Sequence, residues 1–293
     1  MAEQKNWAGS TYGSTWMHRQ LVGALKFIDV RLLYLFSALF IVPVCCVTNA
    51  SRRTSWHFFR RQMGYGRWRA LWAVYRNHCM FSQTVIDRFA MFAGKRFRVE
   101  VEGMEWYNRL AALPEGFLQL SAHVGCYEVA GYTLVATTKR FNALVYGGEK
   151  ATVMDGRREQ FAHTNIRMIP VVPDMSHLFT VNEALANGET VSMPSDRVFG
   201  SPKTVEVAFV GSPAKFPMGP FSVATMRSLD VIAVNVMKTS LRGYTVYVTP
   251  LHYDKSLPRR QQTVQLAEAY AAELEKRVRQ YPTQWYNFFE FWS

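Results

Sequence analysis

Short β-rich runs alternate with helical stretches from about residue 97 onward, and this alternation limits the fold more than any other feature of the chain. Eight runs favour strands, because β-branched and aromatic residues dominate them. The runs are FRVEVEG, FLQLSAH, FNALVYG, RMIPVV, TVSMPSD, TVEVAFVG, DVIAVNVM and YTVYVTP. The sequence therefore predicts an α/β fold with a central mixed, largely parallel sheet flanked by helices. Functional residues are expected where strands lead into helices.

Helical patterns fill most of the remaining chain. The expected helices are YEVAGYTLVAT, the region around MDGRREQFAHT, MSHLFTVNEALANG, PFSVATMRS and a long amphipathic segment over residues 259–281. Gly188 is expected just beyond the third of them, where a helix commonly ends in a left-handed residue. Residues 51–96 also favour helix and are expected to pack on the sheet. Residues 215–220, KFPMGP, are expected to form a pocket loop and a helix start.

The N-terminal third carries nearly all the excess positive charge and one long apolar run. Residues 1–100 hold 15 Lys and Arg against 4 Asp and Glu, while the remaining residues hold 19 against 18. Twenty uncharged residues separate Arg31 from Arg52. As a helix they would reach roughly 30 Å, about the hydrocarbon thickness of a bilayer. We therefore predict an N-terminal membrane-anchoring segment in residues 1–50 and an α/β domain over residues 51–293, leaving open whether residues 32–51 cross the membrane.

The residues around the apolar run support a membrane surface. The stretch WMHRQLVGALKFIDVR is expected to form one helix with an apolar face, and RRTSWHFFRRQMGYGRWRALW interleaves Arg with Trp and Phe. Two alternatives remain: a buried core helix for the run, and RNA binding for the Arg-rich tract. The four cysteines form no CxxC pair, so we expect no metal site and a reducing compartment. GxSxG, P-loop and HExxH motifs do not occur.

The chemistry is expected in SAHVGCYEVAGY. His123 follows a predicted strand, and Glu128 lies five positions later. Gly125 would allow the chain to turn so that the Glu128 carboxylate reaches the imidazole. A carboxylate bound to one imidazole nitrogen fixes the tautomer, and the other nitrogen can then remove a proton. The sequence thus predicts His123 as general base and Glu128 as its orienting partner.

HVGCYE resembles the His-x4-Asp/Glu motif of the lysophospholipid acyltransferase superfamily, and in particular its lipid A late acyltransferase (lauroyl/myristoyl transferase) branch. Further similar segments follow in the same order: MPSDRVFGS, VAFVGSPAKFPMGPFSVA and YPTQWYNFFEFW. The N-terminal NWAGSTYGSTWMHR is similar too. Cys126 stands where many relatives have Asn. The resemblance implies a glycerolipid acyltransferase-like fold that moves a long acyl chain from an acyl-carrier-protein or CoA thioester to a hydroxyl or amine of a lipid, without another cofactor.

The resemblance also assigns roles to residues outside the His motif. Asp196 and Arg197 match an acidic-basic element, in which Arg197 would hold an acceptor phosphate or polarise the oxyanion that develops. Arg158, with its neighbour Arg157, and Lys215 are weaker substrate-binding candidates. The implied partners are the acyl donor, a lipid acceptor and the membrane, not nucleic acid. The implied location is the bacterial inner membrane, with the catalytic domain on the cytoplasmic side.

Two other classes of function stay open. A membrane-surface lipid-binding or scaffold protein could keep this fold without catalysis. An RNA-binding protein could use the Arg and aromatic tract, with an affinity that falls steeply with salt. The apolar run and the complete His-x4-Glu motif favour the transferase over both.

Overall fold

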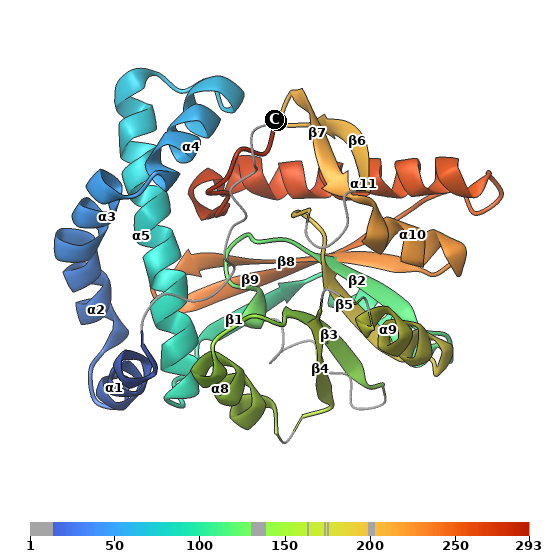
Figure 1. The fold of residues 1–293 in the computed structure, drawn as a ribbon, viewed down its shortest axis with the longest axis horizontal. Coiled ribbons are helices and arrows are strands. Elements are labelled where there is room, and N and C mark those ends of the chain that lie inside the picture. Colours follow the sequence, from blue (N-terminus) through green and yellow to red (C-terminus); the bar gives the residue numbers. More distant parts are fainter. Residues whose placement is uncertain are drawn as a thin grey trace.

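A computed structural model describes residues 14–129, 139–162, 164–172, 174, 176–198 and 203–292. Its centre is a seven-stranded sheet in the order β1-β9-β8-β2-β5-β3-β4 (Figure 1). The strands are β1 Arg98–Glu102, β2 Phe117–Ser121, β3 Phe141–Tyr146, β4 Ile166–Val171, β5 Thr190–Pro194, β8 Val231–Ser240 and β9 Gly243–Leu251. Every neighbouring pair is parallel except β8–β9. The predicted mixed, largely parallel sheet is confirmed.

Helices cover both faces of the sheet (Figure 1). They are α6 Met104–Ala112, α8 Ala151–Phe161, α9 His177–Ala186, α10 Met218–Met226 and α11 Arg259–Gln280, with single 3-10 turns η3 Tyr127–Val129 and η4 Pro282–Gln284. Alternate residues of β8 enter two cores: Ala233 packs in the α11 core, and Val234 packs in the α6 core. Gly188 has φ +75° two positions after the last residue of α9, just beyond the helix as predicted.

A two-stranded hairpin lies beside α11 and is separate from the main sheet. It pairs β6 Thr204–Phe209 with β7 Ser212–Pro217 in antiparallel register. The sequence predicted β6 but assigned residues 215–217 to a pocket loop, and that part was wrong. Ala214 and Phe216 are buried while Lys215 is exposed, so the segment has the two-residue period of a strand. The helix start at Met218 is confirmed.

Helices form the N-terminal third of the described chain. They are α1 Thr15–Leu25, α2 Val30–Phe36, the π-helical η1 Ser37–Ile41, α3 Val42–Thr48, α4 Ser51–His57, the π-helical η2 Phe58–Gln62 and the 26-residue α5 Arg67–Phe92. The single helix expected before the apolar run is two helices, because Asp29 caps the start of α2. The stretch Val30–Thr48 is long and apolar enough to cross a membrane, and only 22% of its most apolar window is buried.

The apolar helix lies along α5 (Figure 1). Tyr75 on α5 donates a hydrogen bond to the Ala38 carbonyl, 2.9 Å away. Near the other end of α5, the Tyr34 hydroxyl and the Lys238 ammonium both bind the buried Asp87 carboxylate. These side chains connect α2 and α5 to strand β8. The N-terminal helices are therefore attached to the central sheet through buried polar contacts.

Candidate active site

His123 and Asp196 meet where two neighbouring strands end. His123 follows β2 and Asp196 follows β5, and these strands are parallel neighbours. The imidazole Nδ1 lies 2.7 Å from Asp196 Oδ1, and the backbone N–H of His123 donates to Asp196 Oδ2 at 2.9 Å. The Asp196 side chain is 2% exposed and the His123 side chain is 23% exposed. One buried carboxylate thus holds both the ring and the main chain of a histidine that solvent can reach.

Glu128 occupies a different position from the one predicted. Its two carboxylate oxygens bind guanidinium groups: Oε1 accepts from Arg157 Nε at 3.1 Å, and Oε2 lies 2.9 Å from Arg88 Nε. The predicted role of Glu128 as the orienting partner of His123 is therefore corrected, because Asp196 holds the imidazole Nδ1. The resemblance implied a substrate-binding role for Asp196. In the structure, Asp196 is the carboxylate that contacts the His123 imidazole.

The loop after β2 depends on Gly125. Its φ is +52°, which is a left-handed conformation, and a Cβ at this position would lie 1.8 Å from the Val236 carbonyl oxygen. The close approach lets the Cys126 N–H donate to that oxygen at 2.9 Å. This contact joins the site loop to β8. Gly125 therefore supplies the predicted turn, although the turn does not bring Glu128 to the imidazole.

The electrostatics of the site favour a neutral imidazole. Burial lowers the pKa of His123 below its usual value, and the Asp196 carboxylate offsets this only in part. Burial would raise the pKa of Asp196, but His123 and Arg197 outweigh it and the pKa is lowered. The pair is thus an uncharged histidine beside a carboxylate at neutral pH. When Nδ1–H donates to Asp196, the lone pair of the ring is on Nε2, which is the arrangement a general base requires.

Arg197 is close to the same pair. It is held by the C-terminal segment, which is the part of the chain that follows helix α11. Its Nη2 donates to the Tyr286 carbonyl at 2.9 Å, and its guanidinium lies 5.6 Å from the centre of the Phe289 ring. Its positive charge helps to lower the pKa of both His123 and Asp196. The structure therefore places Arg197 within electrostatic reach of the histidine.

Cys126 does not have the properties of a nucleophile. Its side chain is buried, and burial raises the pKa of the thiol to about 12. A thiol with that pKa carries almost no thiolate near neutral pH. Cys126 packs instead in the core that includes Val129 and Val236.

The structure does not bring the weaker substrate-binding candidates to the histidine. Arg158 is exposed and pairs with Asp155 at 3.1 Å, whereas its neighbour Arg157 is buried against Glu128. Lys215 is exposed on β7, opposite Glu206 in the hairpin. Most of the helix expected over YEVAGYTLVAT lies outside the described residues.

The C-terminal segment is part of the site, although the sequence analysis assigned no role to its individual residues. The Tyr286 N–H donates to the His123 carbonyl at 3.2 Å, and the Gly125 N–H donates to the Gln284 carbonyl at 2.8 Å. Residues 284–286 thus run antiparallel to the loop that carries His123. The only sequence signal for this contact was YPTQWYNFFEFW as a segment of the resemblance.

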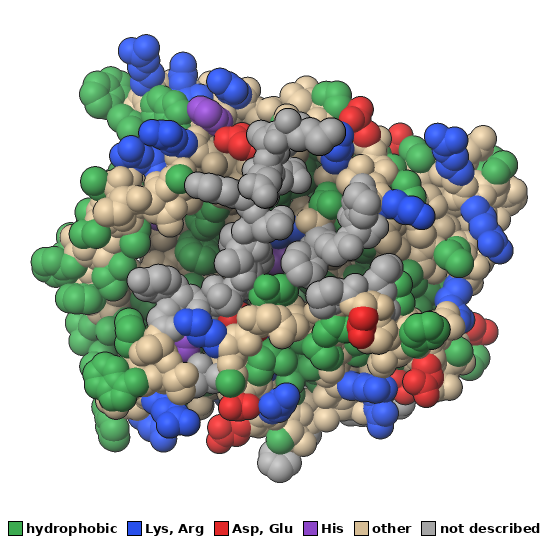
Figure 2. All heavy atoms as spheres, viewed as in Figure 1, with side chains coloured by type: hydrophobic (Ala, Val, Ile, Leu, Met, Phe, Trp, Pro, Cys, Tyr) green, Lys and Arg blue, Asp and Glu red, His purple; other side chains and the backbone are tan. Residues whose placement is uncertain are grey.

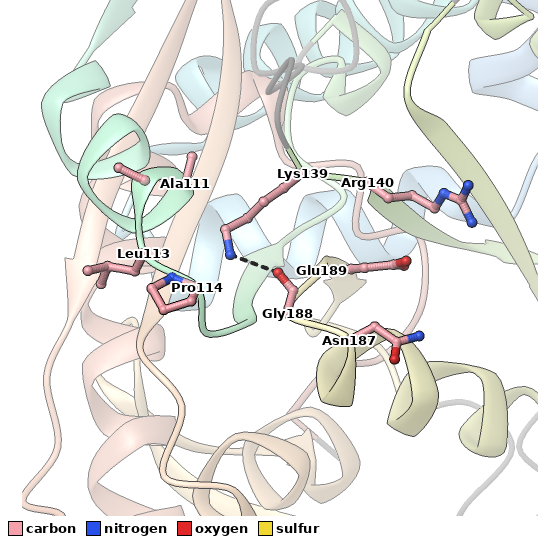
Figure 3. Close-up of a pocket in the computed structure, with 9 residues that line it drawn as sticks. Ala111, Leu113, Pro114, Lys139, Arg140, Asn187, Gly188 and Glu189 are labelled. Atoms are coloured by element: carbon pink, nitrogen blue, oxygen red, sulfur yellow. Dashed lines mark hydrogen bonds between the residues drawn. The ribbon is translucent and has the colours of Figure 1, made fainter.

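An open cleft of about 480 Å³ lies at the other end of the sheet (Figure 3). It is formed by the segments that precede β2, β3 and β5, so it faces away from the strand ends that carry His123 and Asp196. Lys139 is the buried cation at this cleft, and its Nζ already donates to the Glu115 and Gly188 carbonyls at 2.8 and 2.7 Å. The cleft therefore offers no catalytic group comparable to the His123 pair.

A sequence profile of bacterial lipid A biosynthesis acyltransferases matches residues 89–293, and this range includes the His123 loop, Asp196 and the C-terminal segment. The chain belongs to the bacterial lipid A biosynthesis acyltransferase family. It is an acyltransferase whose family acts on lipid. None of the curated proteins matches the chain. A solved structure, the 1-acyl-sn-glycerophosphate (LPA) acyltransferase PlsC from Thermotoga maritima, has a TM-score of 0.41 at 15% identity and covers 88% of this chain and 99% of its own.

Proposed function

We propose that this acyltransferase moves a long acyl chain from an acyl-carrier-protein or CoA thioester to a hydroxyl or amine of a membrane lipid, with His123 as general base and Asp196 as its orienting carboxylate. The observation that carries the proposal is the 2.7 Å contact between His123 Nδ1 and Asp196 Oδ1 at the ends of two parallel strands. It supports Nε2 as the proton acceptor. No further cofactor is required for this chemistry.

The reaction requires one proton to pass from the acceptor to His123 and then from His123 to the departing thiolate. His123 Nε2 accepts the proton of the acceptor hydroxyl or amine as that atom attacks the thioester carbonyl carbon. The tetrahedral intermediate then collapses, the C–S bond breaks, and the imidazolium returns the proton to the departing thiolate. Asp196 stabilises the imidazolium that exists between these steps. No acyl-enzyme forms in this scheme, and the raised pKa of the Cys126 thiol agrees with that.

Arg197 supplies a fixed positive charge that stabilises the negative charge developing on the thioester oxygen. A cation held in a fixed position in a partly buried site stabilises such charge, because it needs little reorganisation during the reaction. The hydrogen bond to the Tyr286 carbonyl and the contact with Phe289 support this role, since they fix the guanidinium beside the catalytic pair. Glu128 with Arg88 and Arg157 forms a second buried cluster that carries a net positive charge. An acceptor with an anionic group is therefore favoured.

The exposed apolar face of the N-terminal helices supports membrane attachment. The face consists of side chains on α2, η1 and α3 that are each at least 48% exposed: Leu32, Leu35, Phe36, Leu39, Phe40, Ile41, Val44 and Val47. Figure 2 shows hydrophobic side chains along the left edge of the molecule, where these helices lie, and Lys or Arg side chains above them, near α4. Soluble monomers rarely expose so large a continuous apolar patch. We place the face in an anionic bilayer, with the basic tract at its surface.

The inner membrane, with the catalytic domain on the cytoplasmic side, is the location that fits this reaction. Acyl-carrier-protein and CoA thioesters are cytoplasmic donors, and the site must reach them. The four cysteines are all free, which agrees with a reducing compartment. The membrane face then lets a long acyl chain approach the site from the lipid phase.

An acceptor and donor panel tests the proposed function. Lysophospholipid, lipid A precursor and mono-acylated aminolipid are offered in mixed micelles with labelled acyl-carrier-protein and acyl-CoA donors. We expect acylation of at least one of these lipids. Arg197→Lys should reduce the rate more than the matched exposed change Arg158→Lys, because only Arg197 loses a guanidinium at the site. Acylation of a soluble metabolite and of none of the lipids would contradict the proposal.

A further inference from the structure

We propose that Gln284 is a positioning residue for His123 and that it acts by holding the C-terminal segment against the catalytic loop. The inference rests on the proposed function of His123. The relevant segment, residues 282–286, follows helix α11 and is far from His123 in sequence. Both ends of the Gln284 side-chain amide bind the Lys238 main chain, so its role is to position the segment.

The main chain of His123 is fixed from two sides. Its N–H donates to Asp196 Oδ2 at 2.9 Å, and its carbonyl accepts the Tyr286 N–H at 3.2 Å. Two residues later, the Gly125 N–H donates to the Gln284 carbonyl at 2.8 Å. Residues 284–286 and 123–125 therefore form a short antiparallel ladder. Asp196 fixes one side of the loop, and the C-terminal segment fixes the other.

Gln284 itself is attached to the sheet by both ends of its side-chain amide. Its Oε1 accepts the Lys238 N–H at 2.8 Å, and its Nε2 donates to the Lys238 carbonyl at 2.7 Å. The side chain is buried, so water cannot replace these bonds at low cost. Lys238 belongs to β8, the strand that also binds the loop through Val236 and Cys126. Gln284 thus sets the distance between β8, the C-terminal segment and the loop of His123.

Asn77 holds the same segment from the other side. Its Nδ2 lies 3.0 Å from both the Thr283 and the Trp285 carbonyls. Asn77 lies on α5, the helix against which the apolar N-terminal helix packs. The segment is therefore held between α5 and β8. Because displacement of a catalytic group by about 1 Å can cost on the order of 10²-fold in rate, this support is expected to matter for catalysis.

Gln284→Met tests the proposal, because methionine has nearly the same shape but lacks the amide. The matched control is Gln262→Met. Gln262 is equally buried, and its amide donates to the Lys255 and Leu257 carbonyls at 3.1 and 2.6 Å, at the start of α11. Acyl transfer is measured with labelled acyl thioester and the best lipid of the panel, at a temperature where melting curves show both variants folded. We expect kcat of Gln284→Met to be about 10- to 100-fold below that of Gln262→Met, with KM nearly unchanged.

Two further variants separate the outcomes. Gln284→Asn keeps an amide that is one methylene shorter, and it replaces Gln284→Met if that variant does not fold; its kcat should also fall. In a His123→Ala background, Gln284→Met should cause no further loss, since it acts through the missing base. Equal kcat for the folded Gln284 and Gln262 variants would overturn the positioning role alone. Wild-type turnover by His123→Ala would instead overturn the proposed function.

Discussion

Asp196 binds His123 twice, through the imidazole Nδ1 at 2.7 Å and through the backbone N–H at 2.9 Å. The two residues are 73 positions apart in sequence and meet because β2 and β5 are neighbouring parallel strands. The double contact fixes the ring orientation relative to the loop that carries it. A general base on this scaffold needs no reorganisation of its carboxylate partner before proton transfer.

Asp196→Asn and Glu128→Gln are expected to have different effects. Asp196→Asn should lower kcat by about 10²–10⁴-fold with a small change in melting temperature, because the imidazole loses its orienting carboxylate. Glu128→Gln leaves Arg88 and Arg157 buried without an opposite charge, so it should cost about 3–5 kcal/mol of stability. Chemical denaturation and steady-state kinetics separate these effects. Glu273→Gln is the control for the stability loss, because it also removes the acidic partner of a buried ion pair, the one with Arg277 on α11.

The acid limb of the pH profile should move in opposite directions in two variants. The proposed mechanism requires neutral His123, so kcat/KM should rise as pH increases through its pKa, which burial lowers below 6.5. Arg197 lowers this pKa, so Arg197→Gln should move the limb to higher pH. Asp196 raises it, so Asp196→Asn should move the limb to lower pH at a reduced maximal rate. Profiles between pH 5 and 8 test this. A shift of both variants in the same direction would contradict the assignment of His123.

Gly125→Ala should damage both stability and activity. The new Cβ would meet the Val236 carbonyl oxygen at 1.8 Å, in a backbone conformation with φ +52° that side chains rarely adopt. Strain of this kind costs on the order of 1–3 kcal/mol of folding stability if the loop keeps its position. Gly219→Ala is the control, because no atom beyond its chain neighbours and the backbone of its own helix lies within 4 Å of the added Cβ. Equal melting temperatures and rates in the two variants would show that the loop does not need its close contact with β8.

Charged substitutions on the apolar face should release the protein from lipid. Phe36→Asp and Phe40→Asp together should greatly reduce flotation with vesicles that contain anionic lipid, since both side chains are more than half exposed on this face. Phe179→Asp is the control: Phe179 is 81% exposed on α9, away from the N-terminal helices (Figure 1). Undiminished flotation of the double variant, or an equal loss with Phe179→Asp, would remove the support for this face as the membrane contact.

The sequence predicted the sheet better than the contacts within the site. Strand and helix patterns are local, so eight strands, the end of α9 and the start of α10 could be predicted from periodicity and from the Gly and Pro positions. Strand β7 was missed because Pro213 and Pro217 weaken its pattern, and only its pairing with β6 makes it a strand. The periodic signal on one strand does not reveal which strand lies beside it. The sequence pattern therefore predicted the nearby Glu128 as the partner of His123 and gave no sign of the contact with the distant Asp196.

The sequence also does not show which of two neighbouring residues on a helix faces the core. Arg157 and Arg158 differ by one position, but only the first faces the core of the domain, and the charge pattern alone does not fix the rotation of α8. The role of the C-terminal segment depends on where the chain passes after α11. Its main-chain bonds to His123 and Gly125 carry no signature in the side-chain sequence.

The most direct test of the account is the turnover of His123→Ala beside the wild-type enzyme. Both are purified in detergent, checked for equal melting temperature, and assayed with labelled acyl thioester and the lipid that the wild type acylates. We predict a loss of at least about 10²–10⁴-fold in kcat with folding unchanged, which is the usual contribution of a general base. A folded His123→Ala variant that turns over at the wild-type rate would contradict the assignment of His123 as the base.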